Sequence, residues 1–154
     1  MSVRRGYGDE IWRLAREGDS ASLHKAADLL LEDTTDLSYD GHRARAFALA
    51  VEGKGDDGLA QLNEGWTEEW PFPAMYATDV GRVRYLAREE DKALSALLLA
   101  VRGAQRVDSG VPELAAECVR RRPRLLWRAL RVMLAGGTTL QRLRHAGTVF
   151  RARF

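Results

Sequence analysis

The sequence is poor in the residues that mark several large classes of protein. A single cysteine, Cys118, excludes an internal disulfide framework and any metal centre built from several cysteines. The longest apolar stretch, residues 93–101, contains a serine and is far shorter than the ~20 residues that cross a bilayer. The first ten residues are polar and lack the apolar core of a signal peptide. These absences predict a cytoplasmic protein with no membrane span.

Motifs of catalysis and of cofactor binding are also missing. Residues 53–55, Gly-Lys-Gly, lack the spacing and the hydroxyl residue of a phosphate-binding loop. The three histidines, His24, His42 and His145, do not have the spacing of metal ligands. Carboxylates that are adjacent in the sequence point apart on a helix or a turn, so they do not form a catalytic pair. We therefore predict that the protein is not an enzyme and holds no metal and no cofactor.

The single cysteine allows two interpretations. Arg120, Arg121 and Arg122 follow Cys118 closely, and cationic neighbours lower the pKa of a thiol when they converge on it. A lone cysteine within a helix is more often a small, buried, apolar residue. We favour the second interpretation.

Positive charge is unevenly distributed and consists almost entirely of arginine. The chain has 21 arginines against three lysines, one asparagine and one isoleucine, a bias that is typical of a GC-rich bacterial genome. The arginine excess alone is therefore no evidence of phosphate binding. The length predicts a single domain, residues 1–154. Within it, residues 1–107 carry a formal charge of −5 and residues 108–154, a basic C-terminal helical extension, carry +7.

Apolar residues recur at helical spacing along nearly the whole chain. Leu94, Leu97 and Val101 show the pattern, which places them on one face of an amphipathic helix. No stretch alternates between apolar and polar residues as a half-buried strand does. The pattern predicts an all-α protein. The nine expected helices span residues 7–17, 19–32, 41–53, 55–66, 74–88, 90–107, 111–121, 123–135 and 138–151.

Glycine, aspartate and proline mark the expected helix boundaries. Gly18 and Gly55 suit the left-handed backbone that ends a helix, and Asp19 suits the first turn of the next one. Pro112 and Pro123 fit the first turn of a helix. Two consecutive glycines, at positions 136 and 137, separate the last two expected helices.

One sequence motif occurs twice, which indicates an internal repeat. Residues 14–21, Leu-Ala-Arg-Glu-Gly-Asp-Ser-Ala, return as residues 86–93, Leu-Ala-Arg-Glu-Glu-Asp-Lys-Ala. A related turn at residues 55–59 lies between them, so the turns fall 37 and then 35 residues apart. A period near 36 with one helix pair per period is typical of a helical repeat array.

Residues 5–107 resemble a tetratricopeptide-repeat protein in this pattern. Gly81, Ala93 and Ala100 have the spacing of the family's small residues, which let the two helices of a pair approach closely. The resemblance implies antiparallel helix pairs stacked as a short right-handed solenoid of three hairpins, with extra C-terminal helices. It also predicts that Gly81 and Ala93 lie at a close contact between helices.

The same resemblance implies a function in protein binding. The first helices of such hairpins line a concave groove that holds peptides or helices, so the leading hypothesis is a scaffold or interaction module that binds a protein segment. The residues expected on the inward faces are Arg13, Arg43, Phe47, Arg82 and Tyr85. Arginines hold carboxylates and aromatic rings add apolar contact, which favours an acidic partner. Carboxylates of the chain itself, or the C-terminal helices, are the alternative occupants of these positions.

The arginine-rich C-terminal helices support a second hypothesis, association with nucleic acid. The candidate phosphate-binding residues are Arg120, Arg121, Arg124, Arg128 and Arg131. The last three share one helix face, and such a basic stripe suits phosphate groups or anionic lipid. The simpler alternative is that these arginines dock on acidic residues of the same chain or face solvent. The oligomeric state and the identity of the partner stay open.

Residues 66–73, Trp-Thr-Glu-Glu-Trp-Pro-Phe-Pro, form the most unusual stretch of the sequence. Each proline disfavours helical geometry at the residue before it, so we expect a rigid, non-helical connection. Burial of the aromatic rings would pin this connection in place, and an aromatic wall beside a ligand groove is the alternative.

Overall fold

The computed structural model describes residues 3–32, 38–66 and 73–154. These residues form nine α-helices and one short 3₁₀ helix, with no β-strand among them, which confirms the all-α prediction. The chain divides into two compact units. The N-terminal unit comprises residues 1–71 and 86–88, and the C-terminal unit comprises residues 72–85 and 89–154. The single-domain organisation stays a prediction.

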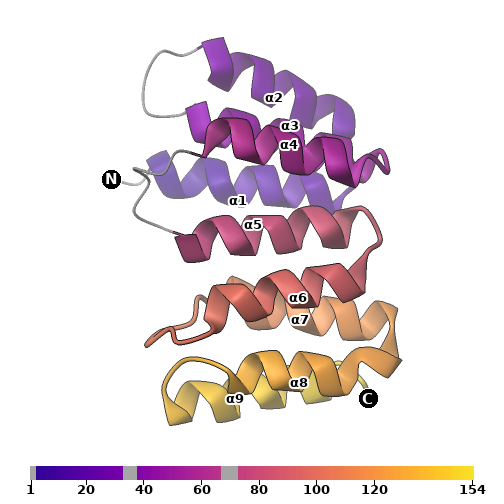
Figure 1. The fold of residues 1–154 in the computed structure, drawn as a ribbon. Helices are drawn as coiled ribbons and strands as arrows, with labels where there is room; N and C mark the ends of the chain where they lie inside the picture. The colour runs from indigo at the N-terminus through magenta and orange to yellow at the C-terminus, as the bar shows by residue number, and fades with distance from the viewer. Residues whose placement is uncertain (1–2, 33–37, 67–72) are drawn as a thin grey trace. The chain divides into compact units, whose positions relative to one another are not determined.

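The N-terminal unit is built from two helix hairpins (Figure 1). Its helices are α1 (Val3–Arg16), α2 (Ser20–Glu32), α3 (Ser38–Val51) and α4 (Gly55–Gly65). Helix α3 packs against both α2 and α4, and each of these three helices has a fully buried large side chain: Leu23 in α2, Phe47 in α3 and Leu62 in α4. Gly41 of α3 lies so close to α2 that a β-carbon there would come within 2.7 Å of the Leu31 side chain.

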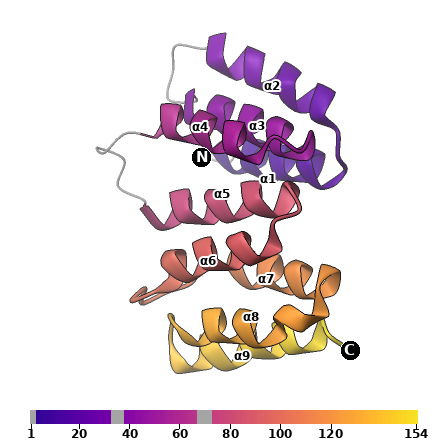
Figure 2. The ribbon, with the colours of Figure 1, turned by 45° about the vertical axis from the view of Figure 1, so that its right-hand side comes forward.

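The C-terminal unit holds the remaining helices. They are α5 (Pro73–Leu86), α6 (Glu90–Val101), α7 (Gly110–Arg121), the 3₁₀ helix η1 (Pro123–Leu125), α8 (Leu126–Leu134) and α9 (Thr139–Arg151). Helix α6 contacts α8, and α7 contacts α9, so α6 and α8 lie in one layer with α7 and α9 behind them (Figures 1 and 2). The inner faces are apolar because each helix buries one stripe, as α8 does with Leu126, Ala129 and Met133.

Three turns between helices share one backbone geometry at regular intervals. Gly18, Gly53 and Arg88 are 35 residues apart, and all three have a left-handed φ between 66° and 84°. The amide that follows each of them donates to the carbonyl five residues back: Asp19 to Leu14, Lys54 to Leu49 and Glu89 to Arg84. This bond is the one that closes a Schellman motif at the end of a helix. The turns therefore repeat with a period of 35 residues where the repeated sequence motif lies.

The predicted boundary residues are correct at the first of these turns and wrong at the second. Gly18 is left-handed, and the Asp19 carboxylate accepts a hydrogen bond from the Ser22 amide at 3.0 Å, as expected for a helix cap. At the second turn Gly53 takes the left-handed conformation, and Gly55 is the first residue of α4. The sequence contains glycine at both positions, so composition alone did not distinguish them.

Helix α6 ends at Val101 and not at the predicted residue 107. Gly103 follows with a φ of 73°, a conformation that does not continue a helix. The next segment is held by the α8–α9 turn, because the amide of Gly137 donates to the carbonyl of Ala104 at 2.8 Å. A β-carbon at Gly136 would collide with the Val101 carbonyl, so the close approach requires glycine.

The close contact predicted at Gly81 and Ala93 is confirmed. Ala93 of α6 is fully buried. A β-carbon built on Gly81 of α5 would lie 3.4 Å from the carbonyl oxygen of Ala93 and 3.0 Å from Cδ2 of Leu97. The two helices are therefore in close contact at these positions, and a side chain at Gly81 would require Leu97 to shift.

We expect Ala93→Leu to lower the free energy of unfolding by about 1–3 kcal/mol, because the added methylene groups must displace packed neighbours. Urea unfolding followed by circular dichroism measures this change. The matched control is Ala60→Leu, the same substitution at an exposed position of α4, which should change the free energy by less than about 0.5 kcal/mol. Equal unfolding midpoints for the two variants would contradict the packing at Ala93.

Candidate functional site

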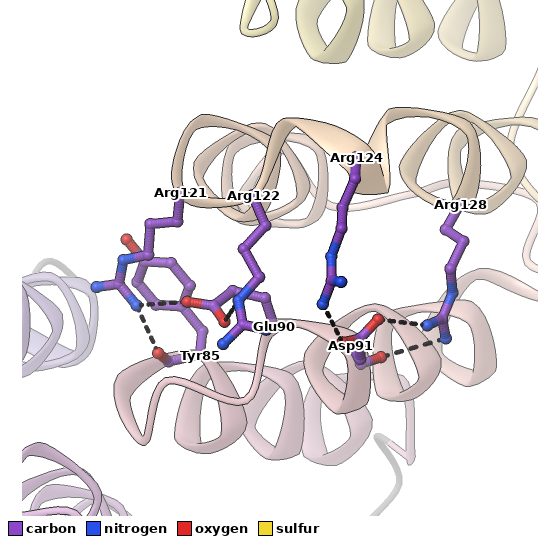
Figure 3. A network of polar contacts seen from close by, with 7 residues as sticks. All are labelled: Tyr85, Glu90, Asp91, Arg121, Arg122, Arg124 and Arg128. Carbon is purple, nitrogen blue, oxygen red and sulfur yellow. Dashed lines mark hydrogen bonds and ion pairs between the residues drawn. The ribbon is translucent and has the colours of Figure 1, made fainter.

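Two carboxylates in the first turn of α6 collect four arginines from later in the chain (Figure 3). Glu90 and Asp91 begin α6, where negative charge also interacts favourably with the helix dipole. The arginines lie between the end of α7 and the first turns of α8, and they are Arg121, Arg122, Arg124 and Arg128. We call these six residues, together with Tyr85 at the end of α5, the arginine cluster.

Glu90 is the buried centre of the arginine cluster. Its side chain is only 2% exposed, and its Oε2 lies 2.8 Å from Nε of Arg122. Its Oε1 lies 3.5 Å from Nη1 of Arg121. The contact with Arg122 is an ion pair without aligned hydrogen-bond geometry, since Oε2 accepts no hydrogen bond. A buried carboxylate loses its hydration, and these two cations offset that loss.

Arg121 also covers the ring of Tyr85. Its guanidinium carbon lies 3.6 Å from the ring centre, and its Nη1 donates to the Tyr85 carbonyl oxygen at 2.7 Å. A planar guanidinium stacked on an aromatic ring is a favourable arrangement that lysine does not reproduce. Burial, together with a hydrogen bond to Glu117, raises the pKa of the Tyr85 phenol above its usual value. Tyr85 is therefore neutral and ties the end of α5 to α7.

Asp91 forms the exposed end of the arginine cluster. Arg128 donates to its Oδ1 at 2.7 Å and to Oγ of Ser95 at 3.0 Å. Nη2 of Arg124 lies 3.9 Å from Oδ2 of Asp91. The Asp91 and Arg128 side chains are about half exposed, so this ion pair contributes about 0.2–1 kcal/mol. Four cations against two anions leave the cluster with a formal charge of +2.

The predicted phosphate-binding arginines differ in their surroundings. Arg121, Arg124 and Arg128 interact with carboxylates of α6, which agrees with the alternative that these residues dock on acidic residues of the chain. Arg120 and Arg131 are exposed, and their side chains form no hydrogen bond or ion pair with the described residues. That any of the five binds phosphate stays a prediction.

A shallow groove lies beside the arginine cluster, between α6 and α8. It measures about 160 Å³, and its lining residues are Leu94, Ser95, Leu98, Arg128, Arg131 and Val132. Leu94, Leu98 and Val132 supply apolar lining, and Arg128 and Arg131 supply positive charge. A volume of this size accommodates a group about as large as benzene, which corresponds to one apolar side chain of a partner.

Helices α8 and α9 and the three residues after α9 expose several large apolar side chains. We call this set the apolar outer surface; its members are Trp127, Leu134, Leu140, Leu143, Phe150 and Phe154. Trp127 is 76% exposed and Phe154 is 87% exposed. Sequence analysis did not identify this surface, because helical periodicity predicts an apolar face without showing whether another element covers it.

In the N-terminal unit, the predicted partner-binding residues contact the chain itself. Arg13 is exposed and forms ion pairs with Glu10 and Glu17 of its own helix. Phe47 is fully buried, with its ring centre 5.7 Å from that of Trp12 in an edge-to-face arrangement. The guanidinium carbon of Arg43 lies 5.4 Å from the Phe47 ring centre.

In the C-terminal unit, the other two predicted partner-binding residues, Arg82 and Tyr85, also contact other residues of the chain. Nη1 of Arg82 donates to Oδ1 of Asp79 at 2.9 Å, and Asp79 is fully buried. Tyr85 is buried under Arg121. The structure does not bring the five residues of the prediction into one exposed face within either unit. Their role in partner binding stays a prediction.

The favoured interpretation of Cys118 is confirmed. Cys118 is fully buried in α7. Burial raises the pKa of its thiol to about 12, and the Glu90 carboxylate acts in the same direction. The arginines that follow Cys118 therefore do not make it a reactive thiolate.

The histidines lie on separate helices. Nε2 of His24 lies 2.8 Å from a carboxylate oxygen of Glu52, and burial lowers the pKa of His145. Within residues 3–32, 38–66 and 73–154, no three His, Cys, Asp or Glu side chains are grouped to hold a metal ion. The same residues contain no helix with the length and apolar character needed to cross a membrane. The aromatic connection predicted at residues 66–73 lies mostly outside the described residues.

Comparisons of the chain with protein-family models, with curated proteins and with solved structures gave no match. The resemblance to tetratricopeptide-repeat proteins therefore stays a prediction.

Proposed function

We propose that this protein is a non-catalytic interaction module that binds an acidic segment of another protein through its C-terminal unit. The observation that carries this proposal is the apolar outer surface and its charge. Residues 118–154 contain ten arginines and no aspartate or glutamate. The large exposed apolar side chains of this surface therefore lie in a segment that carries arginine and no carboxylate side chain.

Two physical arguments support a protein partner. Soluble monomers rarely expose contiguous apolar patches unless the patch binds something. Trp, Phe and Arg are also the residues that are enriched at the centres of protein interfaces, where they contribute most of the binding energy. The excess of arginine favours a partner of negative charge, since complementary charge speeds association and disfavours wrong partners.

The repeated turns support a repeat-array architecture as part of this proposal. Left-handed residues at positions 18, 53 and 88 form the turns between the two helices of successive helix hairpins, at equal intervals of 35 residues. Arrays of such hairpins present extended surfaces that bind peptides or helices. A right-handed solenoid of the tetratricopeptide type is the arrangement that we propose for them.

The proposal predicts that partner capture depends on the apolar outer surface. Tagged protein is incubated with host cell extract, and captured proteins are quantified by mass spectrometry. In the variant Trp127→Ser/Leu143→Ser/Phe150→Ser, the specific partners should fall by about tenfold or more, because loss of a single central aromatic anchor costs about 2 kcal/mol of binding free energy. Retention of all partners by this variant, with its helical content intact by circular dichroism, would contradict the proposal.

The matched control is Leu29→Ser, which changes an equally exposed leucine of α2 in the N-terminal unit. It should leave capture unchanged. Nuclease treatment of the extract tests the second candidate, nucleic-acid association, which the unpaired Arg120 and Arg131 favour. Loss of the captured proteins after nuclease treatment, with a steep dependence on salt, would replace the protein-binding proposal with this alternative.

A further inference from the structure

The outer face of α9 carries apolar residues at the spacing of a helix–helix seam. Leu140 and Leu143 are 68% and 67% exposed, and Phe150 continues the row on α9. Phe154 follows at the same sequence spacing, three residues after the end of the helix. With Gly147 between them, these positions alternate in steps of three and four residues along the sequence. Steps of three and four define the a and d positions of a heptad, which form the contact line between two packed helices.

The opposite face of α9 is already used. His145 and Val149 are buried, and α9 packs against α7 and α8 within the C-terminal unit. In the heptad numbering His145 is an f residue, which lies on the side of the helix away from the a and d positions. The exposed row is therefore a second apolar face, distinct from the one that attaches α9 to its unit.

Arginines flank the exposed row. Arg144 and Arg151, both within α9, fall at e positions of the same heptads, and Arg153 follows the end of the helix. The side chains of Arg144 and Arg151 are exposed and form no hydrogen bond or ion pair with the described residues. Residues at e and g decide the choice of partner in paired helices, because they face the flanking residues of the other helix. Arginine at these positions selects glutamate or aspartate opposite.

A second copy of this chain is a poor occupant of the row. Because residues 118–154 contain no acidic residue, two α9 helices placed together would bring arginine against arginine. Like charges at these positions destabilise a helix pair.

A lipid surface also fits the row less well than a helix does. Helices that lie in a bilayer interface bury a broad apolar face, whereas the a and d positions alone form a narrow seam. Gly147 lies at the middle of the seam, and a β-carbon there would have only the tip of Arg151 nearby, at 3.7 Å. The seam thus has an open position that a side chain of a facing helix fills, as in knobs-into-holes packing.

From this geometry we infer that α9 is one half of a two-helix interface, and that its occupant is an acidic amphipathic helix of a partner protein. That helix carries leucine-like residues at its own a and d positions and glutamate or aspartate at its e and g positions. The inference rests on the proposed function, since it names the partner class for the apolar outer surface. It places the centre of recognition at Leu143, Gly147 and Phe150.

Designed peptides of about 21 residues, three heptads long, test this inference directly with the full chain. The acidic probe has leucine at a and d and glutamate at e and g. The basic probe replaces these glutamates with lysine, and the third probe replaces the leucines of the acidic probe with serine. Fluorescence anisotropy of labelled probes gives each dissociation constant. The acidic probe should bind at least about tenfold more tightly than either of the others.

A charge exchange provides the sharpest test. Arg144→Glu/Arg151→Glu should weaken binding of the acidic probe by about tenfold or more and strengthen binding of the basic probe by a similar factor. The reason is that glutamate at these positions repels the glutamates of the acidic probe and attracts the lysines of the basic probe. Leu143→Ser/Phe150→Ser should weaken the acidic probe to the same extent or further. Arg102→Glu, at an exposed arginine after α6, and Leu29→Ser should leave every dissociation constant unchanged.

Several results would overturn the inference. Equal binding of the acidic and basic probes would do so, as would an unchanged dissociation constant in the charge-exchange variant. Sedimentation of the protein with phosphatidylserine vesicles, abolished by Leu143→Ser/Phe150→Ser, would assign the seam to a membrane surface. A concentration-dependent dimer that the same variant abolishes would assign it to a second copy. If the probes fail while the capture experiment still depends on the apolar outer surface, the proposed function stands and the helical partner is wrong.

Discussion

Arg82→Ala is expected to lower the free energy of unfolding by about 3–5 kcal/mol, the cost of removing one partner from a buried ion pair. Asp79 is fully buried, and Nη1 of Arg82 donates to its carboxylate at 2.9 Å. The Arg82 side chain also lies against the start of α7, where a β-carbon on Gly110 would come within 2.8 Å of its guanidinium. The variant leaves a buried negative charge without this cation and removes a contact between α5 and α7.

Urea unfolding followed by circular dichroism measures the effect, and Arg102→Ala is the matched control. Arg102 is exposed, so its substitution should change the free energy by less than about 0.5 kcal/mol. Adding Asp79→Asn to Arg82→Ala should recover part of the loss, because a neutral amide is less costly to bury than a carboxylate. A loss below about 1 kcal/mol for Arg82→Ala would show that the ion pair is not buried as described.

Phe47→Ala should destabilise the protein by about 3–5 kcal/mol, since it removes a large buried ring and leaves a cavity. Phe47 is fully buried in α3, it meets Trp12 edge to face, and Arg43 lies over its ring. Aromatic pairs of this kind add about 0.5–1.5 kcal/mol beyond the burial of their area. We therefore expect the loss to lie in the upper part of the range.

Phe150→Ala is the matched control, because it removes the same side chain from an exposed position and so tests whether burial causes the loss of stability at Phe47. Phe150 is about half exposed on α9, so Phe150→Ala should cost about 1 kcal/mol or less in the urea experiment. It should instead weaken the binding of the acidic probe. Similar unfolding free energies for the two variants would contradict the placement of Phe47 in the core.

Variants of Arg82 and Phe47 are unsuitable for testing partner binding, because both residues stabilise the fold. Arg82 and Phe47 both belong to the residues that sequence analysis expected on an inward, partner-binding face. A charge reversal at Arg82 would place a second carboxylate beside the buried Asp79, so loss of binding in that variant would report loss of structure. Variants of the exposed residues of α8 and α9 avoid this ambiguity because their side chains lie largely outside the core, where substitutions usually change stability little.

Local sequence determined the helices and most of their boundaries. The apolar periodicity of a helix and the glycine, aspartate or proline at its ends depend on residues that are close in the sequence. These signals can therefore be recognised without knowledge of the fold. Gly18, Asp19 and the two glycines before α9 act as boundary residues in the structure as expected. The contact at Gly81 and Ala93 was also predictable, because small residues at repeat spacing indicate where helices approach closely.

Tertiary structure alone decided which faces are covered and which arginines are paired. A guanidinium at position 121 or 128 meets the carboxylates of α6 only because α7 and α8 pack beside that helix, and no local pattern records such a contact. The end of α6 at Val101 has a local signal in Gly103, but the packing of the following segment against Gly136 and Gly137 depends on the fold. The apolar periodicity of α9 permits either of two faces to pack inward. His145 and Val149 fill the space against α7 and α8, which leaves Leu140, Leu143 and Phe150 on the outside.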